Sequence, residues 1–137
     1  QPEIHTLLEE MGTILGQLFQ RSDDLLDYDI RNHEGKAILG DMKSGYLNSF
    51  GAFFARDLSK DQRESLKQLQ NLDQLYSLLG GKDKFDHWVS EFDKANQFLI
   101  DVYHHHLKTL ESLLGDQEQG LVICLQPLTD ILYWRKV

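Results

Sequence analysis

The first thirty residues carry apolar side chains at the three- and four-residue spacing of an α-helix, not at the alternation of a strand. The pattern predicts a long amphipathic helix over residues 3–31. Its apolar positions are Ile4, Leu7, Leu8, Met11, Ile14, Leu15, Leu18, Phe19, Leu25, Leu26 and Ile30. Gly12 and Gly16 lie one turn apart in this helix, where the missing side chains leave room either for close packing of another helix or for a ligand.

A polar loop over residues 32–35 follows the first helix and leads to Lys36. Gly40 and Gly45 then bracket a short polar segment, and residues 46–58 predict a second helix. This helix is rich in aromatic side chains, namely Tyr46, Phe50, Phe53 and Phe54. Aromatic residues at this spacing are typical of a packed core, and they also suit the wall of a hydrocarbon pocket.

Three more helical segments complete the chain. The capping box at Ser59–Gln62 predicts the start of a third helix, which ends at Gly80. A fourth helix is expected over residues 83–114, and a last segment over residues 118–135 contains Pro127, which should kink or divide it. No strand candidate has comparable strength. The expected fold class is therefore all-α, an antiparallel helical bundle with short connections, in one domain over residues 1–137.

Composition narrows the functional classes. The chain has 137 residues, is 41% hydrophobic and carries a net charge of −8, which disfavours binding to nucleic acid and to anionic membranes. Cys124 is the single cysteine, so an internal disulfide is excluded, and its apolar neighbours predict a buried thiol. No signal peptide or transmembrane run is visible, which favours a reduced, cytoplasmic setting. Because the helical pattern is under way from Gln1-Pro2 without an initiator methionine, a longer parent polypeptide is expected.

The acidic stretch near the end of the first predicted helix is the candidate for chemistry. Helical spacing places Asp23 and Asp27 on one face, with Asp24 at its edge and Gln20 one turn earlier. Like charges repel at this spacing, so a cation or water must compensate them. Magnesium prefers such oxygen ligands, and it typically takes one or two carboxylates and leaves its other positions to water and phosphates. The stretch therefore indicates phosphate chemistry, although a solvated helix face would have the same pattern.

The other candidate motifs are weaker. Consecutive residues on a helix point about 100° apart, so His104, His105 and His106 are not expected to bind one metal ion. No Ser/His/Asp or Cys/His spacing is recognisable, and no phosphate-binding glycine loop is present. Hydrolysis through a side-chain nucleophile is therefore disfavoured.

One set of residues resembles, in order and spacing, the second aspartate-rich region of the trans-isoprenyl diphosphate synthases (polyprenyl synthetase family). The set is Gly12, Gly16, Phe19, Gln20, Asp23, Asp24, Asp27 and Tyr28, followed by Gly35, Lys36, Asp41 and Gly45. The resemblance implies the C-terminal part of an all-α isoprenoid synthase domain. It also implies a magnesium-dependent homodimeric enzyme that condenses an allylic diphosphate with isopentenyl diphosphate.

The resemblance assigns roles to individual residues. Asp23, Asp24 and Asp27 match the metal-binding aspartates of the family, and Gln20 matches the glutamine beside them. Lys36 matches a lysine that contacts the diphosphate and so helps to stabilise the departing pyrophosphate. The aromatic residue next to the prenyl chain is matched by Phe19.

Two features depart from the family pattern. The family has lysine directly after the glycine that matches Gly45, then threonine and proline, where this chain has Tyr46, Asn48 and Phe50. The family's first aspartate-rich motif has no counterpart in residues 1–11. Three alternatives therefore stay open: a non-catalytic or regulatory subunit of a heteromeric prenyl synthase, an enzyme similar to squalene or phytoene synthases, and an acidic helical bundle without chemistry.

Overall fold

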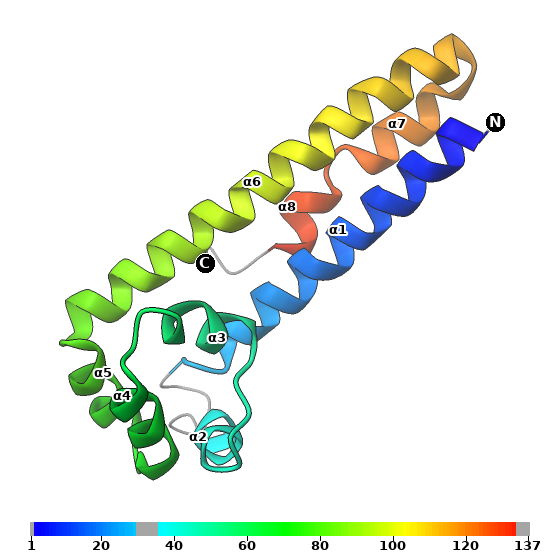
Figure 1. Cartoon of the computed structure of the whole chain (residues 1–137). Coiled ribbons are helices and arrows are strands. Elements are labelled where there is room, and N and C mark those ends of the chain that lie inside the picture. The colour runs from blue at the N-terminus through cyan, green and yellow to red at the C-terminus, as the bar shows by residue number, and fades with distance from the viewer. Residues whose placement is uncertain (1, 30–35, 134–137) are drawn as a thin grey trace. The chain divides into compact units, whose positions relative to one another are not determined.

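The computed structural model describes residues 2–29 and 36–133, and within these ranges every regular element is a helix. The expected all-α fold class is confirmed. The α-helices are α1 (Pro2–Leu26), α2 (Lys36–Lys43), α3 (Ser49–Ala55), α4 (Lys60–Ser65), α5 (Leu72–Leu79), α6 (Lys82–Leu114), α7 (Gln119–Leu125) and α8 (Leu128–Leu132) (Figure 1). Two short 3-10 helices cover Leu66–Gln68 and Gly115–Glu118. The loop expected at residues 32–35 and the end of the last segment near Arg135 lie outside the described residues.

Strong sequence signals place several elements correctly. Helix α6 covers the expected residues, and Pro127 separates α7 from α8 as predicted. The capping box before α4 is also confirmed, because Ser59 Oγ accepts from the Gln62 backbone N–H at 3.1 Å and Gln62 Oε1 accepts from the Ser59 backbone N–H at 2.9 Å.

Other boundaries differ from the expectation. The first helix ends at Leu26 instead of continuing to residue 31, and the aromatic helix is confined to α3. The third helix is divided, because Leu69 is extended and the Asn71 side chain accepts from the Gln74 backbone N–H to start α5 as a new helix. Helix α2 was not expected at all.

The chain divides into two compact units. Unit 1 comprises Gln1–Ser22 and Lys94–Val137, and unit 2 comprises Asp23–Asp93. Each unit thus contains one part of α1 and one part of α6, the two long helices.

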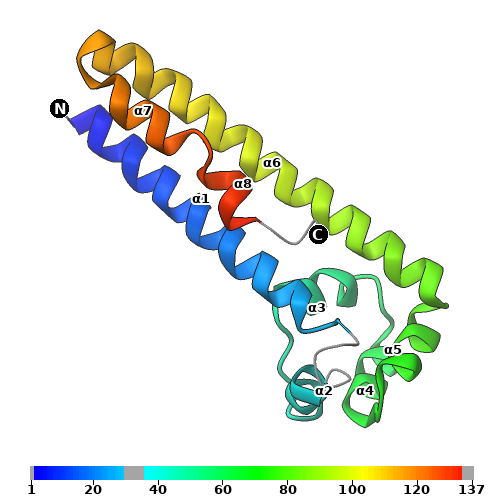
Figure 2. The same ribbon diagram turned by 180° about the vertical axis from the view of Figure 1, so that it is seen from behind.

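In unit 1, α1 lies beside the later part of α6, and α7 and α8 lie beside them in both views (Figures 1 and 2). Arg21 Nη1 donates to Asn96 Oδ1 at 2.7 Å, whereas His106 Nε2 lies 2.9 Å from Glu10 Oε2. Residue numbers therefore rise along α1 as they fall along α6, so the two helices are antiparallel.

Helices α7 and α8 run antiparallel to α6 by the same reasoning. Tyr103 Oη donates to the Leu125 carbonyl at 2.6 Å, and Asn96 Nδ2 donates to Tyr133 Oη at 2.8 Å. Asn96 is fully buried, and its amide is bonded on both sides, to Arg21 and to Tyr133. A buried amide that is satisfied in this way fixes the register of the helices around it.

Unit 2 packs around aromatic side chains. Phe50 and Phe54 of α3 are fully buried, as the core interpretation of the aromatic helix predicted, and Phe50 packs edge-on against Tyr28 with ring centroids 5.0 Å apart. Phe85 and Phe92 of α6 complete the cluster at 5.7 and 5.2 Å from Phe50. Edge-to-face pairs at such distances contribute about 0.5–1.5 kcal/mol each beyond the area they bury.

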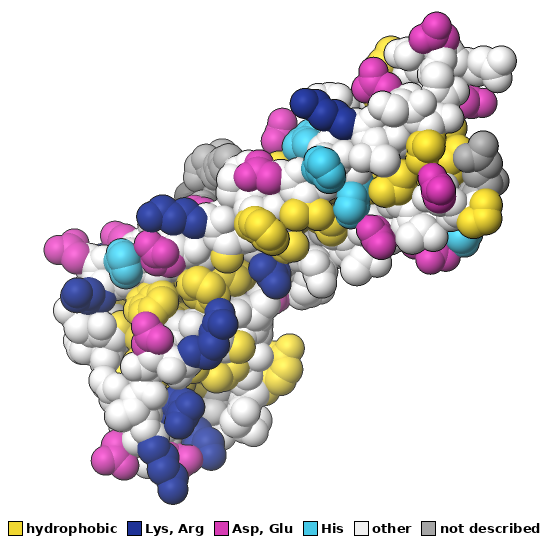
Figure 3. Space-filling view, turned by 45° about the horizontal axis from the view of Figure 1, so that its top comes forward, with side chains coloured by type: hydrophobic (Ala, Val, Ile, Leu, Met, Phe, Trp, Pro, Cys, Tyr) yellow, Lys and Arg dark blue, Asp and Glu magenta, His cyan; other side chains and the backbone are white. Residues whose placement is uncertain are grey.

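Some residues that were expected inside lie at the surface. The prediction of a buried thiol is wrong, since Cys124 is exposed on α7 beside Ile123, which is 70% exposed. Apolar neighbours in the sequence gave no information about which face of the short helix is covered. Figure 3 shows Lys and Arg side chains interspersed with Asp and Glu side chains on the visible face of unit 2. Among the described helices, none has the length and hydropathy needed to cross a membrane.

Gly51 is required by a close approach inside unit 2. A Cβ atom at this position would lie 2.7 Å from the hydroxyl oxygen of Tyr28, whose ring is held in the aromatic cluster. We therefore expect Gly51→Ala to lower the free energy of unfolding by about 1–3 kcal/mol, as overpacking typically does. Gly40→Ala is the matched control, because no atom lies within 4 Å of that Cβ position and alanine favours the helix by roughly 0.5–1 kcal/mol. Urea denaturation of both variants tests the prediction, and a stabilised Gly51→Ala protein would contradict it.

Candidate functional site

The three aspartates of the candidate site lie at the end of α1 in unit 2, and we call Asp23, Asp24 and Asp27 the acidic turn. Asp23 and Asp24 are helical, but Asp27 lies in the turn after Leu26. The helix ends there because the chain tightens: the Tyr28 N–H donates to the Leu25 carbonyl at 3.1 Å, and the Asp29 N–H donates to the Leu26 carbonyl at 3.0 Å. The single helical face expected for Asp23 and Asp27 thus stops one residue short of Asp27.

Asp24 is bound by the first residue of α3. Its side chain is only 6% exposed, and its Oδ2 accepts from the Ser49 backbone N–H at 3.0 Å and from Ser49 Oγ at 2.6 Å. Bonds to a charged acceptor are short and about twice as strong as neutral ones. Asp24 therefore joins α1 to α3, a structural role that the resemblance did not imply.

Asn48 connects the other members of this site. Its Oδ1 accepts from the Gly51 backbone N–H at 3.0 Å, which caps α3, and from Tyr28 Oη at 3.2 Å. Its Nδ2 donates to the Asp24 carbonyl at 3.0 Å and to Asp27 Oδ2 at 3.4 Å. One amide thus caps the start of α3 and also satisfies a carbonyl at the end of α1.

Neighbouring negative charges and partial burial affect the protonation of Asp27 in the acidic turn. Partial burial raises the pKa of Asp27 above its ordinary value of 3.8, and the hydrogen bond from Asn48 lowers it. The negative charges of Asp23, Asp24 and Asp41 raise the pKa of Asp27 further. Asp41 lies on α2, so two separate segments of unit 2 bring their carboxylates within electrostatic reach of Asp27.

Asp27→Asn tests this crowding. Because the folded pKa of Asp27 lies above the unfolded value, the folded state holds more protons between those two values, and its stability falls as pH rises through them. The charged form of Asp27 therefore destabilises the fold at neutral pH. We expect Asp27→Asn to raise Tm by about 1–2 °C at about pH 7 and to leave it unchanged in acid, where Asp27 is already protonated. A lower Tm of the variant at neutral pH would contradict the prediction.

The remaining expected site residues lie on separate elements. Phe19, 49% exposed, and Gln20 lie on the part of α1 that belongs to unit 1. Lys36 is the exposed first residue of α2 in unit 2, while Gly35 lies outside the described residues. No atom lies within 4 Å of a Cβ position at Gly12 or Gly16, so close packing against another described helix does not explain these glycines.

Magnesium suits part of this donor set. The acidic turn offers only hard oxygen ligands, with Asp23 exposed and Asp27 half-buried, whereas Asp24 Oδ2 is committed to Ser49. Among residues 2–29 and 36–133, no three His, Cys, Asp or Glu side chains are grouped closely enough to enclose a metal ion. Carboxylate oxygens are the kind of ligand that magnesium prefers, but the described residues do not bring such side chains together as a metal-binding group.

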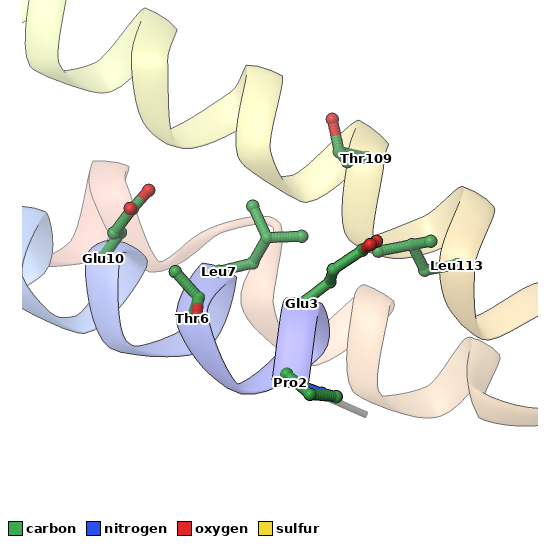
Figure 4. Close-up of a pocket in the computed structure, with 7 residues that line it drawn as sticks. All are labelled: Pro2, Glu3, Thr6, Leu7, Glu10, Thr109 and Leu113. Carbon is green, nitrogen blue, oxygen red and sulfur yellow. The ribbon is translucent and has the colours of Figure 1, made fainter.

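Two other features of unit 1 were considered as sites. The neighbouring histidines have different partners: His104 Nε2 lies 3.3 Å from Thr129 Oγ1, and His106 Nε2 lies 2.9 Å from Glu10 Oε2. An open pocket of about 390 Å³ lies between the start of α1 and the end of α6 (Figure 4). Its lining contains none of the expected site residues and consists of Pro2, Glu3, Thr6, Leu7, Glu10, Thr109 and Leu113.

Sequence reasoning missed Asn48 and Ser49 as members of the site. An Asn before an apolar run is a signal for a helix N-cap, and it was present at Asn48. Nothing in the sequence indicated that the cap would also contact the acidic turn. Comparison of the chain with models of known protein families, with curated proteins and with solved structures finds no match.

Proposed function

We propose that this chain is the C-terminal part of a trans-isoprenyl diphosphate synthase, which condenses an allylic diphosphate with isopentenyl diphosphate with the help of magnesium. One observation carries the proposal beyond the motif. Asp27 and Asp41 belong to different segments of the resembling set, and the charge of Asp41 is the smallest of the contributions that raise the pKa of Asp27 in unit 2. A cation shared by such carboxylates would remove this repulsion, which is a physical reason for bringing them together.

In this proposal the residues of unit 2 divide the work of holding the diphosphate. Asp23 and Asp27 hold magnesium, and Lys36 contacts the diphosphate directly. A bound magnesium ion supplies positive charge against the negative charge that builds on the departing pyrophosphate.

The test is an assay of pyrophosphate release by the full-length protein. An allylic diphosphate and isopentenyl diphosphate are supplied together, and release is measured with magnesium and with EDTA. We expect release only with magnesium, and a loss of about 100-fold or more in kcat/KM for Asp23→Ala, which removes a ligand of the charge-stabilising ion. Asp57→Ala is the matched control, because Asp57 is also an exposed aspartate of unit 2 but lies after α3. Wild-type turnover by Asp23→Ala would refute the proposal.

A second candidate is a non-catalytic subunit of a heteromeric prenyl synthase. The observation that favours it is Tyr46, which stands where the family has lysine and is 59% exposed. A tyrosine can donate a hydrogen bond to phosphate, but it brings no positive charge. In the same assay this candidate predicts no release by the full-length protein alone and release after a catalytic partner is added.

A further inference from the structure

The open pocket between the start of α1 and the end of α6 has an apolar middle. Leu7 of α1 and Leu113 of α6 line it, and both side chains are half-buried. The hydroxyl of Thr109 donates to the His105 carbonyl at 3.2 Å and points away from α1 (Figure 4). The volume of about 390 Å³ lies within the usual range of small-molecule pockets. The middle of the pocket is therefore suited to a hydrocarbon chain.

Two carboxylates flank this apolar middle. Glu3 and Glu10 both line the pocket, and Figure 4 shows them on either side of Leu7. They are two turns apart, so their positions lie on nearly the same side of α1 and about 10.5 Å apart along its axis. The described residues that line the pocket include no lysine or arginine to balance the two negative charges. An occupant with positive charge at both ends would complement this arrangement.

Both carboxylates can accept hydrogen bonds from a ligand. Glu3 is exposed, and the side chain of Glu10 is 53% exposed. His106 Nε2 lies 2.9 Å from Glu10 Oε2. An ionised carboxylate has about four acceptor sites on its two oxygens, so this contact leaves Glu10 able to accept from an ammonium group as well.

We infer that this pocket binds a linear molecule with an ammonium group at each end and methylene groups between them, the chemistry of aliphatic diamines and polyamines. One ammonium group bonds to Glu3 and the other to Glu10, while the methylene groups lie against Leu7 and Leu113. An anion would be repelled by both carboxylates, and a molecule with a single positive charge would leave one of them without a partner. A helix of a partner protein would need an interface of about 1,000 Å² or more, whereas the volume of the pocket matches a small molecule.

The inference goes beyond the proposed function and does not depend on it. None of the residues that line the pocket belongs to the set that resembles the synthases. All of them lie in unit 1, whereas the acidic turn lies in unit 2. Failure of one proposal therefore leaves the other standing.

The test is a calorimetric titration of the full-length protein with 1,8-diaminooctane at low ionic strength, where exposed charges are least screened. The extended length of this diamine matches two turns of an α-helix. Octylamine keeps the hydrocarbon chain but has only one ammonium group, and 1,4-diaminobutane is too short to reach both carboxylates. We expect one molecule of 1,8-diaminooctane to bind per chain, about three- to fivefold more tightly than octylamine and more tightly than 1,4-diaminobutane, because only the longer diamine forms both ion pairs.

Three variants locate the binding site. Glu3→Gln and Glu10→Gln should each weaken binding of 1,8-diaminooctane about three- to fivefold, the usual effect of losing one exposed ion pair. Glu9→Gln is the matched control, because it removes the same charge from an exposed position of α1 that lies outside the pocket and contacts His5 at 2.8 Å. It should bind like wild type. If Glu10→Gln loses stability together with its contact to His106, Glu3→Gln alone decides the test.

Three results would overturn the inference. Equal weakening by Glu9→Gln would mean that the diamine is attracted to the negative charge of the whole chain. Equal affinity for 1,8-diaminooctane and octylamine would mean that only one carboxylate takes part. Binding of a helical peptide with two lysines seven residues apart, without binding of the diamine, would assign the pocket to a protein partner instead.

Discussion

Phe50→Ala is expected to lower the free energy of unfolding by about 3–5 kcal/mol, the usual cost of removing a buried phenylalanine ring. Phe50 has no exposed surface, and four rings surround it with centroids 5.0–5.7 Å away. These rings belong to Tyr28, Phe54, Phe85 and Phe92, so the cavity would be lined by several elements of unit 2. Rings of this size in a shared cluster cannot collapse into the space without losing contacts elsewhere.

Urea denaturation followed by circular dichroism measures this loss. Phe98→Ala is the matched control, because the Phe98 side chain on α6 is 67% exposed and its removal creates no cavity. We expect the control to stay within about 0.5 kcal/mol of wild type. A loss below about 1 kcal/mol for Phe50→Ala would mean that the aromatic side chains of unit 2 do not form a packed core.

How well the fold could be predicted depended on the length of each helical pattern. Helix α6 is long and ends before Gly115, whose φ of 66° is a backbone conformation that favours glycine. The apolar periodicity of its sequence was therefore sufficient to predict where this helix begins and ends. Helix α2 has only eight residues with Gly40 among them, and such a helix depends on tertiary contacts made by Ile38, Leu39 and Met42. Its local sequence carried too little information to reveal it.

The sequence identified the aspartates of the candidate site, but it did not predict which residues would form hydrogen bonds with them. The spacing of Asp23, Asp24 and Asp27 was visible in the sequence, whereas the bonds of Asp24 and Asp27 come from residues more than twenty positions away. Long-range bonds of this kind follow from the packing of α3 against the end of α1. The resemblance therefore assigned the same metal-binding role to all three aspartates, whereas in the structure Asp23 is exposed, Asp27 is half-buried and Asp24 is buried.

This difference leads to a second large expected effect. Asp24→Ala should lower the free energy of unfolding by about 2–3 kcal/mol, because it removes two bonds to a charged acceptor and leaves the Ser49 N–H without its acceptor. Asp23→Ala should leave the midpoint of urea denaturation unchanged, because its side chain is exposed. If the proposed function holds, both variants lose magnesium-dependent turnover, but only Asp24→Ala loses it together with stability.

Ser49→Ala and Asp24→Asn then separate the two contributions to that loss. Ser49→Ala removes the hydroxyl bond alone and should cost about 1 kcal/mol, while the backbone N–H of residue 49 keeps its bond to Asp24. Asp24→Asn keeps an oxygen that can accept from Ser49 but removes the charge, so it should fall between wild type and Asp24→Ala. Equal stability of Asp24→Ala and Asp23→Ala would contradict the assignment of Asp24 as the residue that joins α1 to α3. In that case the acidic turn would have no anchor on α3 apart from Asn48, and the distinction between a structural and a cation-binding aspartate would not hold.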